Sequence, residues 1–204
     1  MTIYKQAMGF SFERLHPMLQ QRYSMTSDQP FKASGVMRTI NGGPKLLYPL
    51  FRIGVYFKLL FPEKGRDVPF TIENTVQVGK NGEAQVHWQR IFSFGNKRRY
   101  FNAVMSLDAE RAIIKDYLGE PSLVYSDLAF HVSEHGGLTI TSEKQRFVLH
   151  KLEIPLPKIF QGLATVNERY NDEKQVFEIS VQVTNPLVGK VFAYEGEFTE
   201  TEQL

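Results

Sequence analysis

Cysteine is absent from this chain of 204 residues. Its absence excludes disulfide bonds, and it also excludes zinc and redox sites that depend on thiolates. A domain of this length buries enough of its surface to fold without such crosslinks. Because a chain without cysteine fits a reducing compartment, we expect the protein to be cytoplasmic.

A large excess of charge of one sign is missing as well. The chain has 24 basic and 22 acidic residues, which gives a formal net charge of +2. Proteins dedicated to nucleic-acid binding usually present a larger basic surface. We therefore expect no nucleic-acid partner.

Long hydrophobic runs are also missing. Residues 1–6 contain no apolar run ahead of a small-residue cleavage site, so no signal peptide is predicted. The longest apolar stretch covers the 16 residues 46–61 and is interrupted by Pro49, Arg52, Gly54 and Lys58. Since a membrane-spanning helix needs about 20 mostly apolar residues, we expect no transmembrane segment.

Aromatic residues, in contrast, are abundant. The chain holds 16 Phe and 9 Tyr, and such residues suit β-strands and apolar cavities. From Val68 onward, apolar and polar residues alternate with a period of two, and Gly79 and Gly82 bracket a predicted hairpin turn. The alternation continues close to the C-terminus, where one face of a predicted strand carries Phe177, Ile179, Val181 and Val183.

Two segments are predicted to be helical. Residues 1–24 carry apolar side chains at spacings of three and four, with a break near Pro17. Residues 46–61 follow a chain breaker at residues 41–44 and are predicted to form one helix, or two short helices bent at Pro49. The segment is apolar nearly all round, so it should be buried on several sides or lie against an apolar surface. Three interpretations stay open for it: an ordinary buried helix, a lid over a barrel mouth, or a membrane anchor. As an anchor it lacks a basic face, because only Arg52 and Lys58 are charged.

These patterns predict a single domain over residues 1–204 that is mainly β with a few helices. About ten strands between residues 31 and 198 form an antiparallel meander, and residues 199–204 form a tail. A meander this long must close or fold over to protect its edges. We therefore expect a closed or half-closed barrel of the calycin or lipid-binding type. Hot-dog and helix-grip folds compete with it, although a helix-grip fold needs a long C-terminal helix where residues 175–198 predict strand.

Several short patterns also carry a family resemblance. They are Leu15-His16-Pro17, Trp88-x-Arg90-x-Phe92, Gly136-Gly137, Leu156-Pro157, Glu168, Pro186-Leu187-x-x-Gly189 and Tyr194-x-Gly196. In their order and spacing they resemble an uncharacterised bacterial family, domain of unknown function 4166, over nearly the whole chain. Members of that family occur alone or C-terminal to a saccharopine-dehydrogenase-like domain. This chain has no G-x-G-x-x-G pattern, so the resemblance implies no dehydrogenase activity. It implies only that the domain works beside a reductase by holding an apolar substrate.

The strongest candidate site residue is Arg90. Trp88, Arg90 and Phe92 share one face of a predicted strand, and a guanidinium buried in an apolar barrel needs a partner. That partner is either a ligand carboxylate or phosphate, held by two hydrogen bonds, or an internal carboxylate, for which Glu168 and Glu73 are the candidates.

Two further patterns have a structural and a functional interpretation. His131, Glu134 and His135 match the H-x-x-E-H zinc motif, but that motif requires a helix and these residues fall in a strand end and a turn. Residues 97–99, Lys-Arg-Arg, stand among aromatic residues and could bind anions, including an anionic membrane surface, but a solvated hairpin tip is the favoured interpretation. Because His131, Glu134 and His135 are not predicted to lie on one helix, we expect no metal site.

The favoured function is non-enzymatic binding of a lipid-like or apolar acidic small molecule, without a cofactor. The cavity would lie between the barrel wall and the helix at residues 46–61, and Arg90 would anchor the acidic head. The predicted ligand-binding residues are Trp88, Arg90, Phe92, Glu168, Tyr194 and His16. Two alternatives stay open: an enzyme or oxidoreductase accessory domain with no identified catalytic residue, and a structural or protein-interaction domain with a filled core. Peripheral membrane contact is a further hypothesis.

Overall fold

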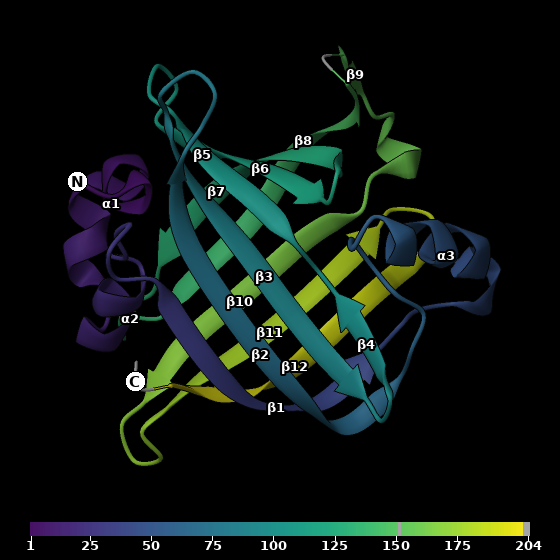
Figure 1. Cartoon of the computed structure of the whole chain (residues 1–204), viewed down its shortest axis with the longest axis horizontal. Coiled ribbons are helices and arrows are strands. Elements are labelled where there is room, and N and C mark those ends of the chain that lie inside the picture. The colour runs from purple at the N-terminus through teal and green to yellow at the C-terminus, as the bar shows by residue number, and fades with distance from the viewer. Residues whose placement is uncertain (151, 202–204) are drawn as a thin grey trace.

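The period-two pattern produces a closed antiparallel barrel (Figure 1). A computed structural model describes residues 1–150 and 152–201. Ten strands build the closed wall, and two short strands, β4 and β9, add to its edges. Their bounds are β1 Phe31–Asn41, β2 Gly65–Val78, β3 Ala84–Phe94, β4 Lys97–Tyr100, β5 Ala103–Asp108, β6 Ile113–Gly119, β7 Ser122–Val132, β8 Leu138–Leu149, β9 Leu152–Pro155, β10 Leu163–Asn171, β11 Val176–Asn185 and β12 Gly189–Glu200.

Each wall strand pairs with the next wall strand along the chain, and one further pairing, between the last and the first, completes the ring. β8 pairs with β10, so that β9 lies outside the closed wall, and β12 pairs with β1. The predicted meander of about ten antiparallel strands is therefore confirmed, and of the two predicted forms the barrel takes the closed one.

The seam between the first and last strands depends on two glycines. Gly35 of β1 lies opposite Phe198, and Gly196 of β12 lies opposite Met37. A Cβ atom on Gly35 would overlap the carbonyl oxygen of Glu197, and one on Gly196 would overlap the backbone of β1. The close approach of β1 and β12 therefore requires glycine at both positions 35 and 196.

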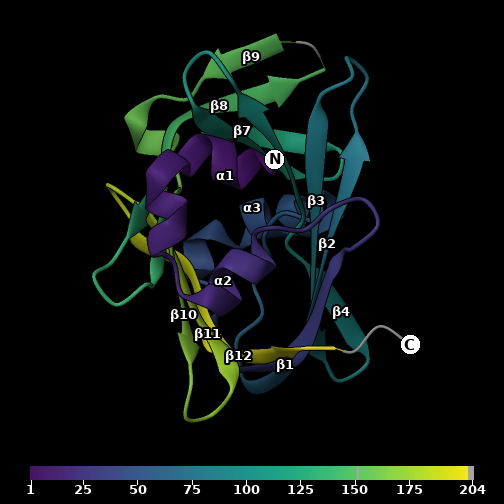
Figure 2. The same cartoon turned by 90° about the vertical axis from the view of Figure 1, so that its left-hand side faces the viewer.

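The predicted N-terminal helix is three short helices that cover one end of the barrel (Figure 2). They are α1 (Ile3–Met8), the 3₁₀ helix η1 (Gly9–Arg14) and α2 (Pro17–Arg22). Pro17 stands at the first position of α2, where its missing N–H costs nothing. Tyr4 attaches α1 to the wall, because its hydroxyl accepts a hydrogen bond of 2.7 Å from Nε1 of Trp88. This end of the barrel is therefore plugged.

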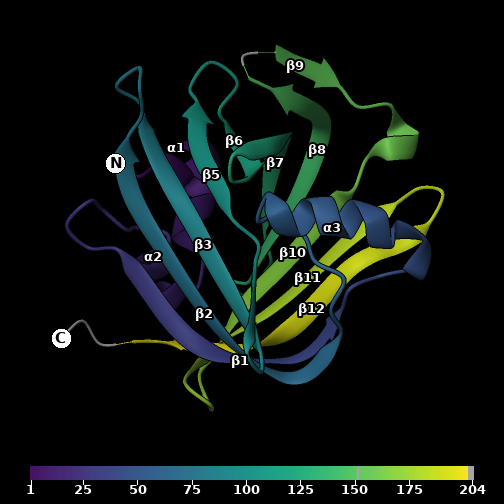
Figure 3. The same cartoon turned by 45° about the vertical axis from the view of Figure 1, so that its right-hand side comes forward.

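The apolar segment after β1 covers the opposite end (Figure 3). It forms the 3₁₀ helix η2 (Lys45–Leu47) and helix α3 (Tyr48–Tyr56). The prediction of a helix over residues 46–61 is thus right in its centre and wrong at its C-terminal end. The chain leaves the helix at residues 57 and 58, whose carbonyl oxygens accept hydrogen bonds from Glu120 N (2.7 Å) and Asn102 N (2.8 Å) on the barrel wall. These two bonds fix the C-terminal end of α3 to the wall.

A buried ion pair lies under the N-terminal plug. Arg22 donates hydrogen bonds to both carboxylate oxygens of Glu168, at 3.0 and 3.2 Å, and the Tyr23 hydroxyl donates a third of 2.7 Å. The Arg22 guanidinium is fully buried and lies 4.3 Å from the ring centroid of Phe31 and 5.0 Å from that of Phe198. Three hydrogen bonds and two aromatic rings therefore stabilise charges that would otherwise be costly to bury.

Several local predictions need correction. Residues 97–99 form strand β4 rather than a hairpin tip, and the Arg99 side chain forms an ion pair with Glu63. β12 continues to Glu200, so it takes up two residues of the predicted tail, while residues 202–204 of that tail lie outside the described residues. In the described part of the chain, no helix is long and apolar enough to cross a membrane.

Candidate functional site

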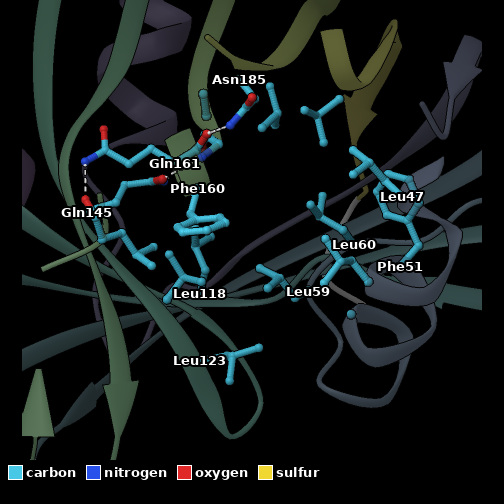
Figure 4. A pocket seen from close by; sticks show the side chains of 18 of the residues that line it. Leu47, Phe51, Leu59, Leu60, Leu118, Leu123, Gln145, Phe160, Gln161 and Asn185 are labelled. Atoms are coloured by element: carbon cyan, nitrogen blue, oxygen red, sulfur yellow. Dashed lines mark hydrogen bonds between the residues drawn. The ribbon is translucent and has the colours of Figure 1, made fainter. Parts of the chain in front are cut away.

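A pocket of about 490 Å³ lies at the end of the barrel that α3 covers. Its wall is made by three segments, residues 47–60 around α3, residues 156–162 before β10 and residues 185–191 at the β11–β12 turn, together with side chains from the barrel strands. Figure 4 shows Leu47, Phe51, Leu59 and Leu60 on one side of this space and Phe160 facing them. We call this space the mouth pocket.

Hydrogen bonds hold the segment at residues 156–162 in place. The Gln145 side chain accepts a bond from Gly162 N (2.8 Å) and donates one to Gly162 O (2.9 Å). The Asn185 side chain donates to the carbonyl oxygens of Ile159 and Gln161, each at 2.8 Å. Because these amide groups are occupied by the backbone, the mouth pocket presents mainly hydrocarbon to whatever enters it.

A second cavity, of about 50 Å³, lies deeper inside the barrel. Three residues, Phe101, Leu118 and Ala164, line both this inner cavity and the mouth pocket. The two spaces therefore adjoin across these three side chains. In contrast to the mouth pocket, the inner cavity is lined by the ionisable side chains of Arg90 and Asp116 and by Ser142.

Arg90 enters the barrel from β3. Its Nε donates a hydrogen bond of 2.6 Å to the carbonyl oxygen of Phe101, and its guanidinium lies 4.0 Å from the centroid of the Phe101 ring. The residue is only 6% exposed. The alternative of an internal ion pair with either named carboxylate is wrong, because Glu168 binds Arg22 and Glu73 binds Lys32.

The carboxyl group of Asp116, on β6, lines the inner cavity together with Arg90. It is 5% exposed, and its Oδ1 has no hydrogen-bond partner among the described residues. Burial raises the pKa of this carboxyl from 3.8 to about 7, and the nearby Arg90 charge acts in the opposite direction. A buried polar oxygen without a partner, at the wall of a cavity, is an open hydrogen-bonding position.

Three of the other predicted ligand residues lie around this inner region. Trp88 lines the inner cavity, with its ring centroid 5.7 Å from the Arg90 guanidinium. Phe92 is fully buried and packs against Tyr194, with ring centroids 5.1 Å apart. Burial raises the pKa of the Tyr194 hydroxyl, and the Arg90 charge acts against that effect. Phe92 and Tyr194 belong to the aromatic core behind Arg90 and line neither cavity.

Glu168 and His16 lie at the plugged end. Glu168 is held in the ion pair with Arg22. The His16 ring caps α2 by accepting a hydrogen bond from Met18 N (3.2 Å), stacks on Tyr170 and lies 3.3 Å from an oxygen of Asp172. Glu168 is bound by Arg22 and Tyr23 rather than by Arg90, and His16 lies against Tyr170 and Asp172. The contacts of both residues are those of side chains that hold α2 against the barrel.

The H-x-x-E-H residues do not converge. His131 lies in β7, while Glu134 and His135 lie in the turn before β8, and all three are exposed. Among the residues that the structure describes, no group of three or more His, Asp or Glu side chains could hold a metal ion.

Asp116 and residues 156–162 are the parts of the site that sequence reasoning missed. Residues 111–118 fit a strand or a helix equally well, so the direction of the Asp116 side chain could not be predicted. An alternation with Ile114 and Leu118 as inward neighbours would have indicated it. Residues 156–162 form the 3₁₀ helix η3 (Lys158–Phe160) and loop, and their place follows from side-chain hydrogen bonds to distant strands.

Comparison with known proteins identifies a family and a curated relative. A family described as "Domain of unknown function (DUF4166)" matches residues 15–198. The "Uncharacterized protein YndH" of Bacillus subtilis (strain 168) is 39% identical over 202 residues, which cover 99% of this chain and 98% of that protein.

Proposed function

The chain belongs to the DUF4166 family, and we propose that this member binds a lipid-like small molecule that combines an apolar body with an acidic head. The apolar body would occupy the mouth pocket, and the head would enter the inner cavity beside Arg90. The observation that carries the proposal is that a hydrocarbon-lined pocket of about 490 Å³ adjoins a small cavity with a buried arginine. Pockets of about 300–1,000 Å³ with a few converging polar groups are typical of small-molecule sites.

Asp116 sets a condition on the head group. If both side chains were ionised, Asp116 would repel an anion that Arg90 attracts. When Asp116 carries its proton, it is neutral and can donate a hydrogen bond from the oxygen that has no partner within the described chain. A carboxylate head would then receive hydrogen bonds from both Arg90 and Asp116, which makes a carboxylic acid with an aliphatic body the ligand class that fits best.

The first experiment is native mass spectrometry of protein purified without added ligand, followed by denaturing extraction. We expect a stoichiometric apolar acid. Titration with a fluorescent long-chain fatty acid and with the corresponding alcohol then tests the head group. R90M removes the charge, and R90Q removes it while keeping a hydrogen-bond donor. Both variants should weaken acid binding about 10- to 100-fold, the value of one charged hydrogen bond, and should leave alcohol binding largely unchanged.

A variant that fills the space between the two cavities provides the second part of the test. Ala164 lines both cavities, so A164L should weaken the binding of acid and alcohol alike. F10S changes a side chain that is 97% exposed on the plugged end and serves as the control. The proposal would be overturned if no ligand were extracted from the protein and the protein bound neither probe. That result would favour the alternative function, a domain that binds other proteins.

A further inference from the structure

An exposed apolar surface surrounds the mouth pocket. It comes from the same three segments that line the pocket, and these segments therefore lie together. Figure 3 shows α3, η3 and the β11–β12 turn at this end of the barrel. We call it the mouth face, and its exposed apolar residues are Leu46, Tyr48, Leu50, Ile53, Tyr56, Ile159, Phe160, Leu187 and Val188.

The exposure of these side chains is large. Leu46, Tyr56 and Leu187 are 81%, 79% and 72% exposed. The buried side of α3, with Phe51 and Gly54, faces the barrel. Leu46, Tyr48 and Tyr56 are exposed and line neither cavity, so this part of the segment carries apolar side chains that cover neither the core nor the pocket. Contiguous apolar surface around a pocket opening marks an interaction site rather than ordinary surface composition.

The charges in the mouth face are all positive. Residues 44–60, 156–162 and 185–191 contain no Asp or Glu. Lys58 forms an ion pair with Glu120 across 2.9 Å. The other four cations, Lys45, Arg52, Lys158 and Lys190, are exposed and form no ion pair within the described residues. The basic residues that α3 lacks by itself are supplied by η3 and the β11–β12 turn.

We propose that the mouth face docks on an anionic lipid bilayer, with its apolar side chains in the interface and its four exposed cations against the lipid head groups. Apolar burial and attraction to anionic lipid act together at such a surface. A protein partner fits less well, because specific protein interfaces deplete lysine and pair their charges. The docking surface does not depend on the proposed ligand, but docking would bring the pocket opening into contact with lipid.

The test is flotation of the whole protein with vesicles of phosphatidylcholine alone and with vesicles that contain phosphatidylglycerol. We expect binding to the anionic vesicles that falls about tenfold or more at high salt and little binding to phosphatidylcholine. Leu46 and Tyr56 belong to the mouth face but line neither cavity, so the double variant L46S/Y56S should lower binding to anionic vesicles about tenfold or more. R52E/K158E should do the same through charge.

The controls change the plugged end in the same chemical way. F10S removes an exposed aromatic side chain, and K80E reverses an exposed cation in the β2–β3 turn; neither should alter flotation. Equal binding of L46S/Y56S and wild type, or equal binding to both vesicle types, would overturn the proposal. So would a wild-type dimer in light scattering that L46S/Y56S converts to monomer without any vesicle binding. A164L, which fills the space between the two cavities, should still float, so the failure of the ligand and the failure of docking are distinguishable.

Discussion

Asp116 affects both the stability of the protein and its proposed function. It lies inside an aromatic barrel, with one oxygen that has no partner in the described chain, and burial holds its pKa near 7. Placing a carboxyl in such a position costs folding free energy whenever the group is ionised. A position of this kind is typical of a group whose hydrogen-bonding capacity is reserved for a ligand.

The pH dependence of stability follows from that pKa. The folded-state pKa of about 7 lies above the ordinary value of 3.8, so the folded protein binds the proton more tightly than the unfolded chain. The contribution of Asp116 to the free energy of unfolding should therefore fall between about pH 4 and pH 7, by up to about 1.4 kcal/mol per pH unit, and stay constant above pH 7.

The substitution D116N removes this titration while it keeps the shape of the side chain. We expect the stability of D116N relative to wild type to rise with pH over the same interval. Urea denaturation at pH 5, 6, 7 and 8 measures the difference. Parallel stability curves for the two proteins would show that Asp116 is not held in a raised-pKa environment.

At the scale of elements, the helices at the two ends have different relations to the wall. The N-terminal helices contribute buried side chains, including Tyr4 and Arg22, to the interior. Helix α3 buries Phe51 and Gly54, packs Val55 against the core, and is fixed by two backbone hydrogen bonds just after its C-terminal end. The plug is therefore part of the core, whereas α3 is a cover over the pocket.

Trp88 reports on the plug, because it is the only tryptophan of the chain and its indole N–H bonds to Tyr4. Y4A removes the ring and the acceptor together, so it should destabilise the protein by about 3–5 kcal/mol and shift the fluorescence of Trp88 to longer wavelength. Y4F removes only the hydroxyl and should cost about 1–3 kcal/mol. F10A, on the exposed side of η1, is the matched control. Unchanged fluorescence and stability in Y4A would contradict the docking of α1 on β3.

How far the sequence predicts these elements depends on the range of the interactions. Alternation along a strand is local, and it predicts strands such as β11, whose inward residues Phe177 and Val181 are buried. The choice of Arg22 rather than Arg90 as the partner of Glu168 is not local, since both guanidinium groups are buried and only the closed wall decides their distances. The C-terminal end of α3 is likewise fixed by hydrogen bonds from residues distant in the sequence, Asn102 between β4 and β5 and Glu120 in the β6–β7 turn.

At the scale of the whole molecule, closure of the barrel depends on the seam between β1 and β12. A barrel has no free edges, and that is how this sheet avoids the exposed edges of an open meander. Gly35 and Gly196 allow the two strands to approach because neither has a side chain in the contact. A single methyl group added at Gly35 or Gly196 would therefore disturb the strand pairing that closes the whole barrel.

We expect G196A to destabilise the protein by about 3 kcal/mol or more, because its methyl group would overlap the β1 backbone, which cannot move without opening the seam. Hydrogen exchange should locate the lost protection in β1 and β12. The control is G162A, where the nearest atom to the new methyl group is a side-chain carbon of Val183 at 3.2 Å, and its cost should stay within about 1 kcal/mol. Equal stability losses for the two variants would mean that the seam has no special role.

The same seam has a consequence for the making of the protein in the cell. A ribosome delivers β1 early and β12 late, and at about 5–20 residues per second the first strand waits on the order of ten seconds for its partner. During that time the nascent sheet has an open edge and an uncovered aromatic face, and α3 covers no pocket. Each round of translation therefore passes through a stage with an open sheet edge, which ends only when the last strand arrives, and such a stage is prone to aggregation.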